Sequence, residues 1–329
     1  MHVSRRFFSK FGKARVSSLG KTAKFSVIAA VGTGQMGGVL CKRLAGDGHT
    51  VLLAGEPCSL PERQALAAVE TKGTLEVVED ITEAVEKADV VLTCLPNSIV
   101  VNEVLNEIIS SPNGPLSNAT LWLDATSGNP AVSKTIGERL LEFEVDFVDC
   151  AVSGGPAGAE EGILTSMIGG ADDASKRAEP YLNSFSSNVV HVGPTGSGHA
   201  VKCVNNAMMA TNLWVAAEGV LALKKFGVSP QAALDAINTS SGRSWGSQNR
   251  IPGHVLTRKF DYGFHLDLLE KDHRTCLESV VKPTGSCAPI LSAMHTNLKI
   301  AQSILKNPAA DHVEICKILE MWSDAEIKE

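Results

Sequence analysis

The sequence lacks an apolar run of about 18 residues, the length that a membrane-spanning helix needs. It contains eight cysteines but no Cys-x-x-Cys pair and no His/Cys spacing typical of a metal site. Acidic residues outnumber Lys and Arg by 36 to 30, so no overall positive charge attracts nucleic acid. We therefore expect reduced thiols, no metal, and neither a nucleic acid nor a membrane as partner.

Acidic residues are also absent from the start of the chain, where Asp47 is the first one. Residues 1–24 instead contain basic residues, serines and three phenylalanines. This composition is typical of an organelle transit peptide, and the apolar segment of a secretory signal is missing. The alternative is a basic tail with no targeting role. We expect a mitochondrial location, with the cytoplasm or a plastid as alternatives, and a fold that begins after this leader.

Short apolar segments alternate with amphipathic ones between residues 25 and 192, which predicts βαβ units and a parallel sheet. The expected strands are Phe25–Val31, Thr50–Ala54, Asp89–Leu95, Ala119–Asp124 and Val145–Asp149. The expected helices are Met36–Gly46, Pro61–Thr71, a capping-box helix from Asp80 to Lys87, Val100–Ile109 and Ala131–Phe143.

The strand pattern ends near residue 192, and helical spacing dominates from there on. The expected helices are Gly198–Phe226, one that starts at Ser229-Pro230, Phe264–Val281, Pro289–Leu305 and Asp311–Trp322. We therefore predict a leader over residues 1–24, an α/β Rossmann-type domain with a parallel sheet over 25–192, and an all-α C-terminal domain over 193–329.

The segment from Gly32 to Gly37 matches the pattern G-x-G-x-x-G, which is a weak signal by itself. Here the segment follows an apolar strand and opens a helix within a βαβ unit. Its glycines permit a tight turn, a close approach of a pyrophosphate to the backbone, and close packing of helix on strand. We predict that a nicotinamide dinucleotide contacts Gly32, Gly34, Gln35, Met36 and Gly37.

The residues after the second expected strand distinguish NAD from NADP. Glu56 is acidic where the 2′-phosphate of NADP would lie, and no basic residue follows until Arg63. We therefore expect NAD, with NADP as the less favoured cofactor. Gly55 occupies the position directly after the strand, so the acid at Glu56 lies one residue further along the chain than usual. The alternative for Glu56 is a solvent-exposed turn residue.

Two later segments contain candidate catalytic groups. Ser153, Gly154 and Gly155 follow an expected strand and offer a hydroxyl and unobstructed N–H groups to a carboxylate, although such a segment is often only a glycine-rich loop. Lys202 and Asn206 are four residues apart, on one face of the longest expected helix. A buried Lys202 would have a lowered pKa and could exchange a proton with a substrate, whereas the alternative is a lysine that reaches the surface.

Together these motifs resemble the β-hydroxyacid dehydrogenase family, and within it the 3-hydroxyisobutyrate dehydrogenase branch, over about residues 25–322. Leu95-Pro96, Asp124-Ala-Thr-Ser127 and Lys271-Asp272 also match the family pattern. The sequence departs from this pattern at Gly55, at Ala151, where the family has proline, and at His273, where Leu or Met is usual.

The resemblance implies a role for each matching residue. Lys202 is the expected catalytic acid/base. The expected substrate contacts are Ser153, Gly154, Gly155, Asn206 and Asp272. The further cofactor contacts implied are Leu95, Pro96, Ser127, Phe264 and Lys271.

The resemblance also implies a reaction and an assembly. The reaction is the NAD-dependent oxidation of a short 3-hydroxy acid, 3-hydroxyisobutyrate to methylmalonate semialdehyde in valine catabolism. The enzyme would be a homodimer or homotetramer whose partner is a small hydroxy acid. One alternative is an NADPH-dependent reductase of glyoxylate, succinic semialdehyde or tartronate semialdehyde. The alternative from another class is a non-catalytic, dinucleotide-binding oligomer.

Overall fold

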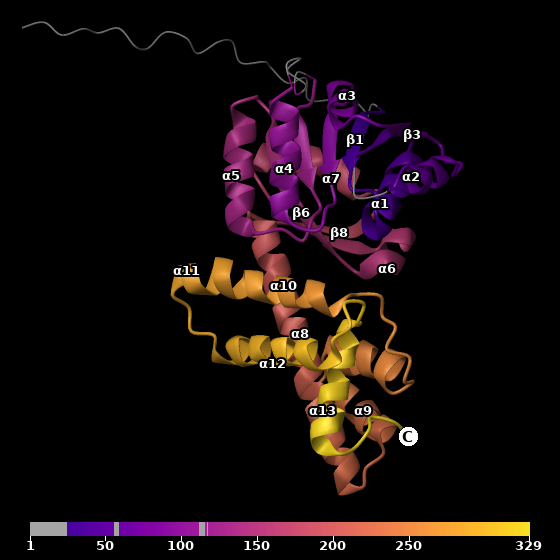
Figure 1. The fold of residues 1–329 in the computed structure, drawn as a ribbon, viewed down its shortest axis with the longest axis vertical. Helices are drawn as coiled ribbons and strands as arrows, with labels where there is room; N and C mark the ends of the chain where they lie inside the picture. Colours follow the sequence, from indigo (N-terminus) through magenta and orange to yellow (C-terminus); the bar gives the residue numbers. More distant parts are fainter. Residues whose placement is uncertain (1–24, 56–58, 112–115, 117) are drawn as a thin grey trace, which may run out of the picture.

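The structure is a computed structural model that describes residues 25–55, 59–111, 116 and 118–329. The expected leader and Glu56 lie outside these residues. The chain forms a part built on one sheet, followed by a helical part, and helix α8 runs from the first into the second (Figure 1). Within the described ranges, no helix is both long and apolar enough to cross a bilayer.

The sheet has eight strands in the order β3-β2-β1-β4-β5-β6-β7-β8. All five expected strands are present, whereas β3, β7 and β8 had no predicted counterpart. The strands are β1 (Val27–Val31), β2 (Thr50–Ala54), β3 (Thr74–Val78), β4 (Val90–Thr93), β5 (Leu121–Asp124), β6 (Asp146–Ser153), β7 (Leu164–Gly169) and β8 (Ser186–Gly193).

Neighbouring strands run parallel, as predicted, except that β6 and β7 are antiparallel. The predicted parallel sheet is thus confirmed for the five predicted strands. The antiparallel pair involves β7, which had no predicted counterpart. The cause of this antiparallel pairing is the short connection from Ser153 to Leu164, since a parallel neighbour needs a crossover of a dozen or more residues. As a result, the chain turns back on itself directly after Ser153.

Helices cover both faces of the sheet, which explains why its central strands are apolar at successive positions. In β1, Ile28 and Ala30 pack into one core and Ala29 and Val31 into another. The helices are α1 (Gln35–Gly46), α2 (Leu60–Ala67), α3 (Ile81–Glu86), α4 (Ser98–Ile109), α5 (Pro130–Leu141), α6 (Gly155–Glu161) and α7 (Asp172–Leu182).

Of the two reciprocal contacts in the capping box expected at Asp80, only the one made by the Asp80 side chain forms. The Asp80 side chain accepts hydrogen bonds from the N–H groups of Thr82 and Glu83, as expected. The Glu83 carboxylate, however, pairs with Lys87 at 2.6 Å on an exposed face, because these residues are one helical turn apart. A complete capping box forms instead at Ser59, where α2 begins.

The helical part is built around α8 (Ser197–Phe226), which has 30 residues. The other elements of this part are α9 (Pro230–Asn238), the π-helices η2 (Gly246–Val255) and η3 (Leu277–Val281), α10 (Leu266–Cys276), α11 (Lys282–Thr284), α12 (Pro289–Leu305), the 3-10 helix η4 (His312–Glu314) and α13 (Ile315–Ser323). Of these, α9, η2, α10, α12 and α13 pack against α8. The helix expected from Phe264 begins two residues later, because Phe264 and Leu266 form backbone hydrogen bonds with His312 and Ala310.

Buried Asp149 on β6 anchors the N-terminus of α8. Its carboxylate accepts hydrogen bonds from the N–H groups of Gly196, at 2.6 Å, and His199, at 2.8 Å. The pKa of Asp149 is raised, chiefly because burial disfavours the charged form. The fully buried His199 ring also contacts Ser133 Oγ at 2.7 Å, so the start of α8 is fixed to both β6 and α5.

Candidate active site

The carboxyl ends of four parallel strands bring the predicted loops to one edge of the sheet. Gly32 follows β1, Leu95 follows β4, Ser127 follows β5, and Ser153 ends β6. The strand order reverses between β1 and β4, which is the usual place for a ligand in an open α/β sheet. The structure thus places the predicted glycine turn beside the other expected cofactor loops.

The glycine turn has the backbone geometry that a dinucleotide pyrophosphate requires. Gly32 has a φ of +92°, and a Cβ there would lie 2.4 Å from the carbonyl oxygen of Cys94. A Cβ on Gly37 would lie 1.9 Å from the carbonyl oxygen of Gly32. Gly34 precedes α1 without a side-chain cap, and the first turn of that helix contains no acid. The N–H groups at the start of α1 therefore fit a phosphate.

Two predicted residues within this turn differ in their surroundings. Gln35 is exposed at the start of α1, whereas Met36 is partly buried against the core. Leu95 is only 6% exposed, and its N–H donates a hydrogen bond to Thr126 Oγ1 at 3.1 Å. Leu95, in the loop after β4, is therefore more buried than Gln35 at the end of the glycine turn.

Lys271 on α10 connects the helical part to the cofactor loops. Its ammonium donates to the carbonyl oxygens of Ser127, at 2.6 Å, and Pro96, at 3.3 Å. It also pairs with Asp272 at 3.1 Å. The structure thus brings together three of the predicted cofactor residues, from segments that are far apart in the sequence.

The predicted acid/base, Lys202, lies on α8 beside a network of polar side chains. Asn206, one turn further along, donates a 2.6 Å hydrogen bond to buried Asp272. Burial lowers the pKa of Lys202, Asp272 opposes this change and Lys271 adds to it. Lys202 is partly buried, and within the described part of the chain it forms no ion pair.

The predicted carboxylate loop adopts a backbone that only glycine accommodates easily. Gly154 has a φ of +135° and Gly155 a φ of +73°. Tyr262, which the sequence analysis missed, lies against this loop, because its hydroxyl is 3.2 Å from the position of a Cβ on Gly155. The partly buried Phe264 lies two residues further on, with its ring 5.6 Å from that of His312. No local sequence pattern around Tyr262 predicts this contact.

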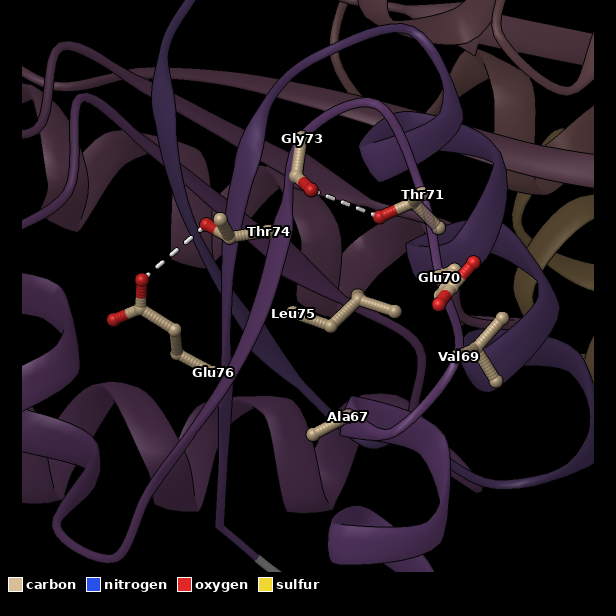
Figure 2. Close-up of a pocket in the computed structure, with 8 residues that line it drawn as sticks. All are labelled: Ala67, Val69, Glu70, Thr71, Gly73, Thr74, Leu75 and Glu76. Atoms are coloured by element: carbon tan, nitrogen blue, oxygen red, sulfur yellow. Dashed lines mark hydrogen bonds between the residues drawn. The ribbon is translucent and has the colours of Figure 1, made fainter.

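A separate shallow pocket lies between the end of α2 and β3 (Figure 2). It includes two acids, Glu70 and Glu76, and β3 is the outermost strand on its side of the sheet. Its lining contains none of the predicted site residues. No group of His, Cys, Asp or Glu among the described residues is arranged to hold a metal ion.

Both parts of the chain match known family models. Residues 27–193 match the NAD binding domain of 6-phosphogluconate dehydrogenase. Residues 196–319 match the model described as NAD-binding of NADP-dependent 3-hydroxyisobutyrate dehydrogenase. The chain belongs to the β-hydroxyacid dehydrogenase family. The predicted family and the fold, a Rossmann-type part followed by a helical part, are therefore confirmed, as is the class of NAD(P)-dependent hydroxyacid dehydrogenase.

Individual members of the β-hydroxyacid dehydrogenase family resemble most of the chain. A 2-(hydroxymethyl)glutarate dehydrogenase from Eubacterium barkeri is 32% identical over 77% of this chain and 81% of its own length. The human mitochondrial 3-hydroxyisobutyrate dehydrogenase is 30% identical over 88% of this chain and 84% of its own. A solved structure of the Mycobacterium tuberculosis 3-hydroxyisobutyrate dehydrogenase with L-serine has a TM-score of 0.79 and 26% identity, and the match covers 90% of this chain and 99% of that one.

Proposed function

We propose that the protein oxidises a short 3-hydroxy acid, 3-hydroxyisobutyrate, to the semialdehyde with NAD as cofactor. The observation that supports this proposal best is the position of Lys202, which has a lowered pKa and lies one helical turn from the Asn206–Asp272 pair. A partly buried amine that forms no ion pair with the described residues is suited to exchange a proton at a pH below the ordinary lysine pKa.

Different residues carry out proton transfer, carboxylate binding and substrate orientation. The Lys202 amine takes the proton of the substrate hydroxyl and, as an ammonium ion, stabilises the oxygen that becomes a carbonyl. Ser153 and the N–H groups of Gly154 and Gly155 hold the substrate carboxylate, and Asn206 and Asp272 orient the hydroxyl. The fixed separation between Lys202 and the Ser153 loop favours 3-hydroxy over 2-hydroxy acids.

The nicotinamide cofactor accepts the hydride in this oxidation. The glycine turn, with Gly32, Gly34, Gln35, Met36 and Gly37, is proposed to bind its pyrophosphate. Further contacts are assigned to the loops after β4 and β5 and to the helical part, through Leu95, Pro96, Ser127, Phe264 and Lys271. The acid at Glu56 favours NAD, because it would repel a 2′-phosphate.

One observation supports NADP instead. The model that matches residues 196–319 is described as that of an NADP-dependent enzyme. A reductase that uses NADPH to reduce glyoxylate, succinic semialdehyde or tartronate semialdehyde is therefore the second candidate. Measuring KM for both cofactors with the purified enzyme separates the two candidates.

The proposal also includes the cellular location and the oligomeric state of the protein. The basic, acid-poor residues 1–24 and the name of the human mitochondrial relative support import into mitochondria and a role in valine catabolism. Exposed apolar side chains on α8, Val201, Met208 and Val215, support a homodimer or homotetramer. Imaging of the tagged full chain tests the location, and light scattering tests the assembly.

A substrate screen with a lysine variant tests the activity. The purified protein is assayed with 3-hydroxyisobutyrate, 2-(hydroxymethyl)glutarate, tartronate, 4-hydroxybutyrate and glyoxylate, each with both cofactors. Lys202→Ala should lower kcat by about 10²–10⁴-fold, the usual effect of losing a general acid or base, with little change in NAD affinity. Lys225→Ala, in the last turn of the same helix, is the control and should keep full activity. Near-normal kcat in Lys202→Ala would contradict the mechanism.

A further inference from the structure

Arg250 on η2 is a buried cation that forms no direct ion pair within the described part of the chain. It is 6% exposed, and among the described residues no Asp or Glu lies within ion-pair distance of its guanidinium. Nε donates to His312 Nε2 at 3.3 Å, and Nη1 donates to Asn249 Oδ1 at 2.6 Å. Both acceptors are neutral groups, since burial also lowers the pKa of His312. Asp311, which contacts the other ring nitrogen of His312 at 3.0 Å, compensates the charge of Arg250 only from a longer distance. A buried charge with such partial compensation is stabilised further when an anion binds nearby.

Tyr262 connects Arg250 to the proposed carboxylate loop. The guanidinium carbon of Arg250 lies 3.3 Å from the centroid of the Tyr262 ring, a cation–π contact. At the far end of the ring, the hydroxyl lies 3.2 Å from the position of a Cβ on Gly155. The hydroxyl oxygen accepts a hydrogen bond from the Arg250 side chain, which has no acceptor atom of its own. Among the described residues, the hydroxyl proton forms no hydrogen bond. The proton of this hydroxyl is therefore free to bind a ligand at the loop.

We propose that the Tyr262 hydroxyl donates a hydrogen bond to the substrate carboxylate at Ser153–Gly155, and that Arg250 supplies the positive charge that favours this carboxylate. Tyr262 is then a binding residue, and Arg250 is a positioning residue that acts through the Tyr262 ring. The pair makes the pocket select acids over neutral analogues of the same shape. This inference rests on the proposed function, because that function places the carboxylate at this loop.

The test compares a carboxylate with its amide. Isobutyrate and isobutyramide have nearly the same shape, so the dissociation constants of both are measured by calorimetry on the NAD-loaded enzyme. Tyr262→Phe should weaken isobutyrate binding about tenfold or more, which is the usual effect of losing a hydrogen bond to a charged group, and leave isobutyramide unchanged. Arg250→Gln should have the same selective effect, and Arg250→Lys a smaller one because it keeps the charge.

The control is Tyr181→Phe, which changes the only other tyrosine of the chain. Tyr181 lies on α7, and its hydroxyl contacts Ser26 Oγ at 3.0 Å, so binding of both ligands should be unaffected. If Arg250→Gln fails to fold, Tyr262→Phe and Arg250→Lys still provide the comparison. Equal losses for acid and amide, no loss for the acid, or a wild type that does not prefer the acid would overturn the proposal. Since binding needs no turnover, this outcome is independent of the lysine mechanism.

Discussion

The side-chain amide of Asn206 on α8 donates a 2.6 Å hydrogen bond to the carboxylate of Asp272 on α10. Asp272 also accepts from Lys271, whose ammonium reaches the loops after β4 and β5. The amide oxygen of Asn206 accepts a hydrogen bond from Asn205 at 3.2 Å. Two helices of the helical part and two loops of the sheet are thus connected by one chain of polar contacts.

This arrangement predicts that two substitutions move the pH profile of oxidation in opposite directions. The rate should rise with pH as Lys202 loses its proton, in a range below the ordinary lysine pKa because burial lowers its pKa. Asp272→Asn removes a charge that raises the pKa of Lys202, so the rise should occur at lower pH. Lys271→Met removes a charge that lowers this pKa, so the rise should occur at higher pH. The measurement is kcat/KM against pH at saturating NAD, and shifts of the same sign would contradict the assignment.

Gly32→Ala should weaken NAD binding and destabilise the protein. The added Cβ would collide with the Cys94 carbonyl, and alanine is strained at a φ of +92°, at a cost of about 1–3 kcal/mol. Gly46→Ala, at the other end of α1, is the matched control, because a Cβ there meets no atom within 4 Å. Fluorescence titration with NADH and thermal unfolding measure both effects. Equal behaviour of the two variants would show that the turn is not tightly constrained.

Asp149→Ala should lower the free energy of unfolding by about 2–6 kcal/mol. The substitution leaves the N–H groups of Gly196 and His199 buried without an acceptor, and each costs about 1–3 kcal/mol. Asp149→Asn keeps one acceptor oxygen and should lose less. Urea unfolding of the three proteins checks this order, and an alanine variant as stable as the wild type would show that α8 does not depend on this anchor.

Replacement of Glu56 should change the choice of cofactor. If the acid repels a 2′-phosphate, Glu56→Gln should lower KM for NADP about tenfold and change KM for NAD much less. The expected result is a smaller ratio of the two KM values. Glu70→Gln, in the pocket beside α2, removes an acid outside the predicted cofactor loops and is the control. If Glu56→Gln leaves the ratio of the two KM values unchanged, Glu56 does not contact the cofactor and is a solvent-exposed turn residue.

Local sequence pattern predicted the elements whose signals are local. The bounds of β2 and α12 agree with the predicted ranges, because a buried strand and a proline-initiated helix have clear ends. β3 was not predicted, since Thr74 and Glu76 are polar and exposed on an outermost strand, and they leave no continuous apolar run over the strand. β7 was missed because the glycine-rich segment before it resembles a loop. β8 was missed because all its residues except Ser186 are exposed or only partly buried.

The residues of the site also divide into those that local sequence predicts and those that depend on tertiary contacts. Lys202 and Asn206 were predictable together, because helical spacing alone puts them on one face. The contact of Tyr262 with Gly155 and the burial of Arg250 join distant segments of the chain, and tertiary packing alone determines them. The direct contact of Lys271 with Ser127 is of the same kind, because the family resemblance implied only that each of the two residues contacts the cofactor.

The length of α8 has a mechanical consequence. At 1.5 Å per residue its 30 residues span about 45 Å, and its first turn is held by Asp149. Lys202 lies in the second turn of the helix, so Asp149 ties it to β6, the strand that ends at Ser153. The amine and the predicted carboxylate loop therefore share one rigid support. A movement of the far end of α8, about 36 Å beyond Lys202, leaves their separation unchanged.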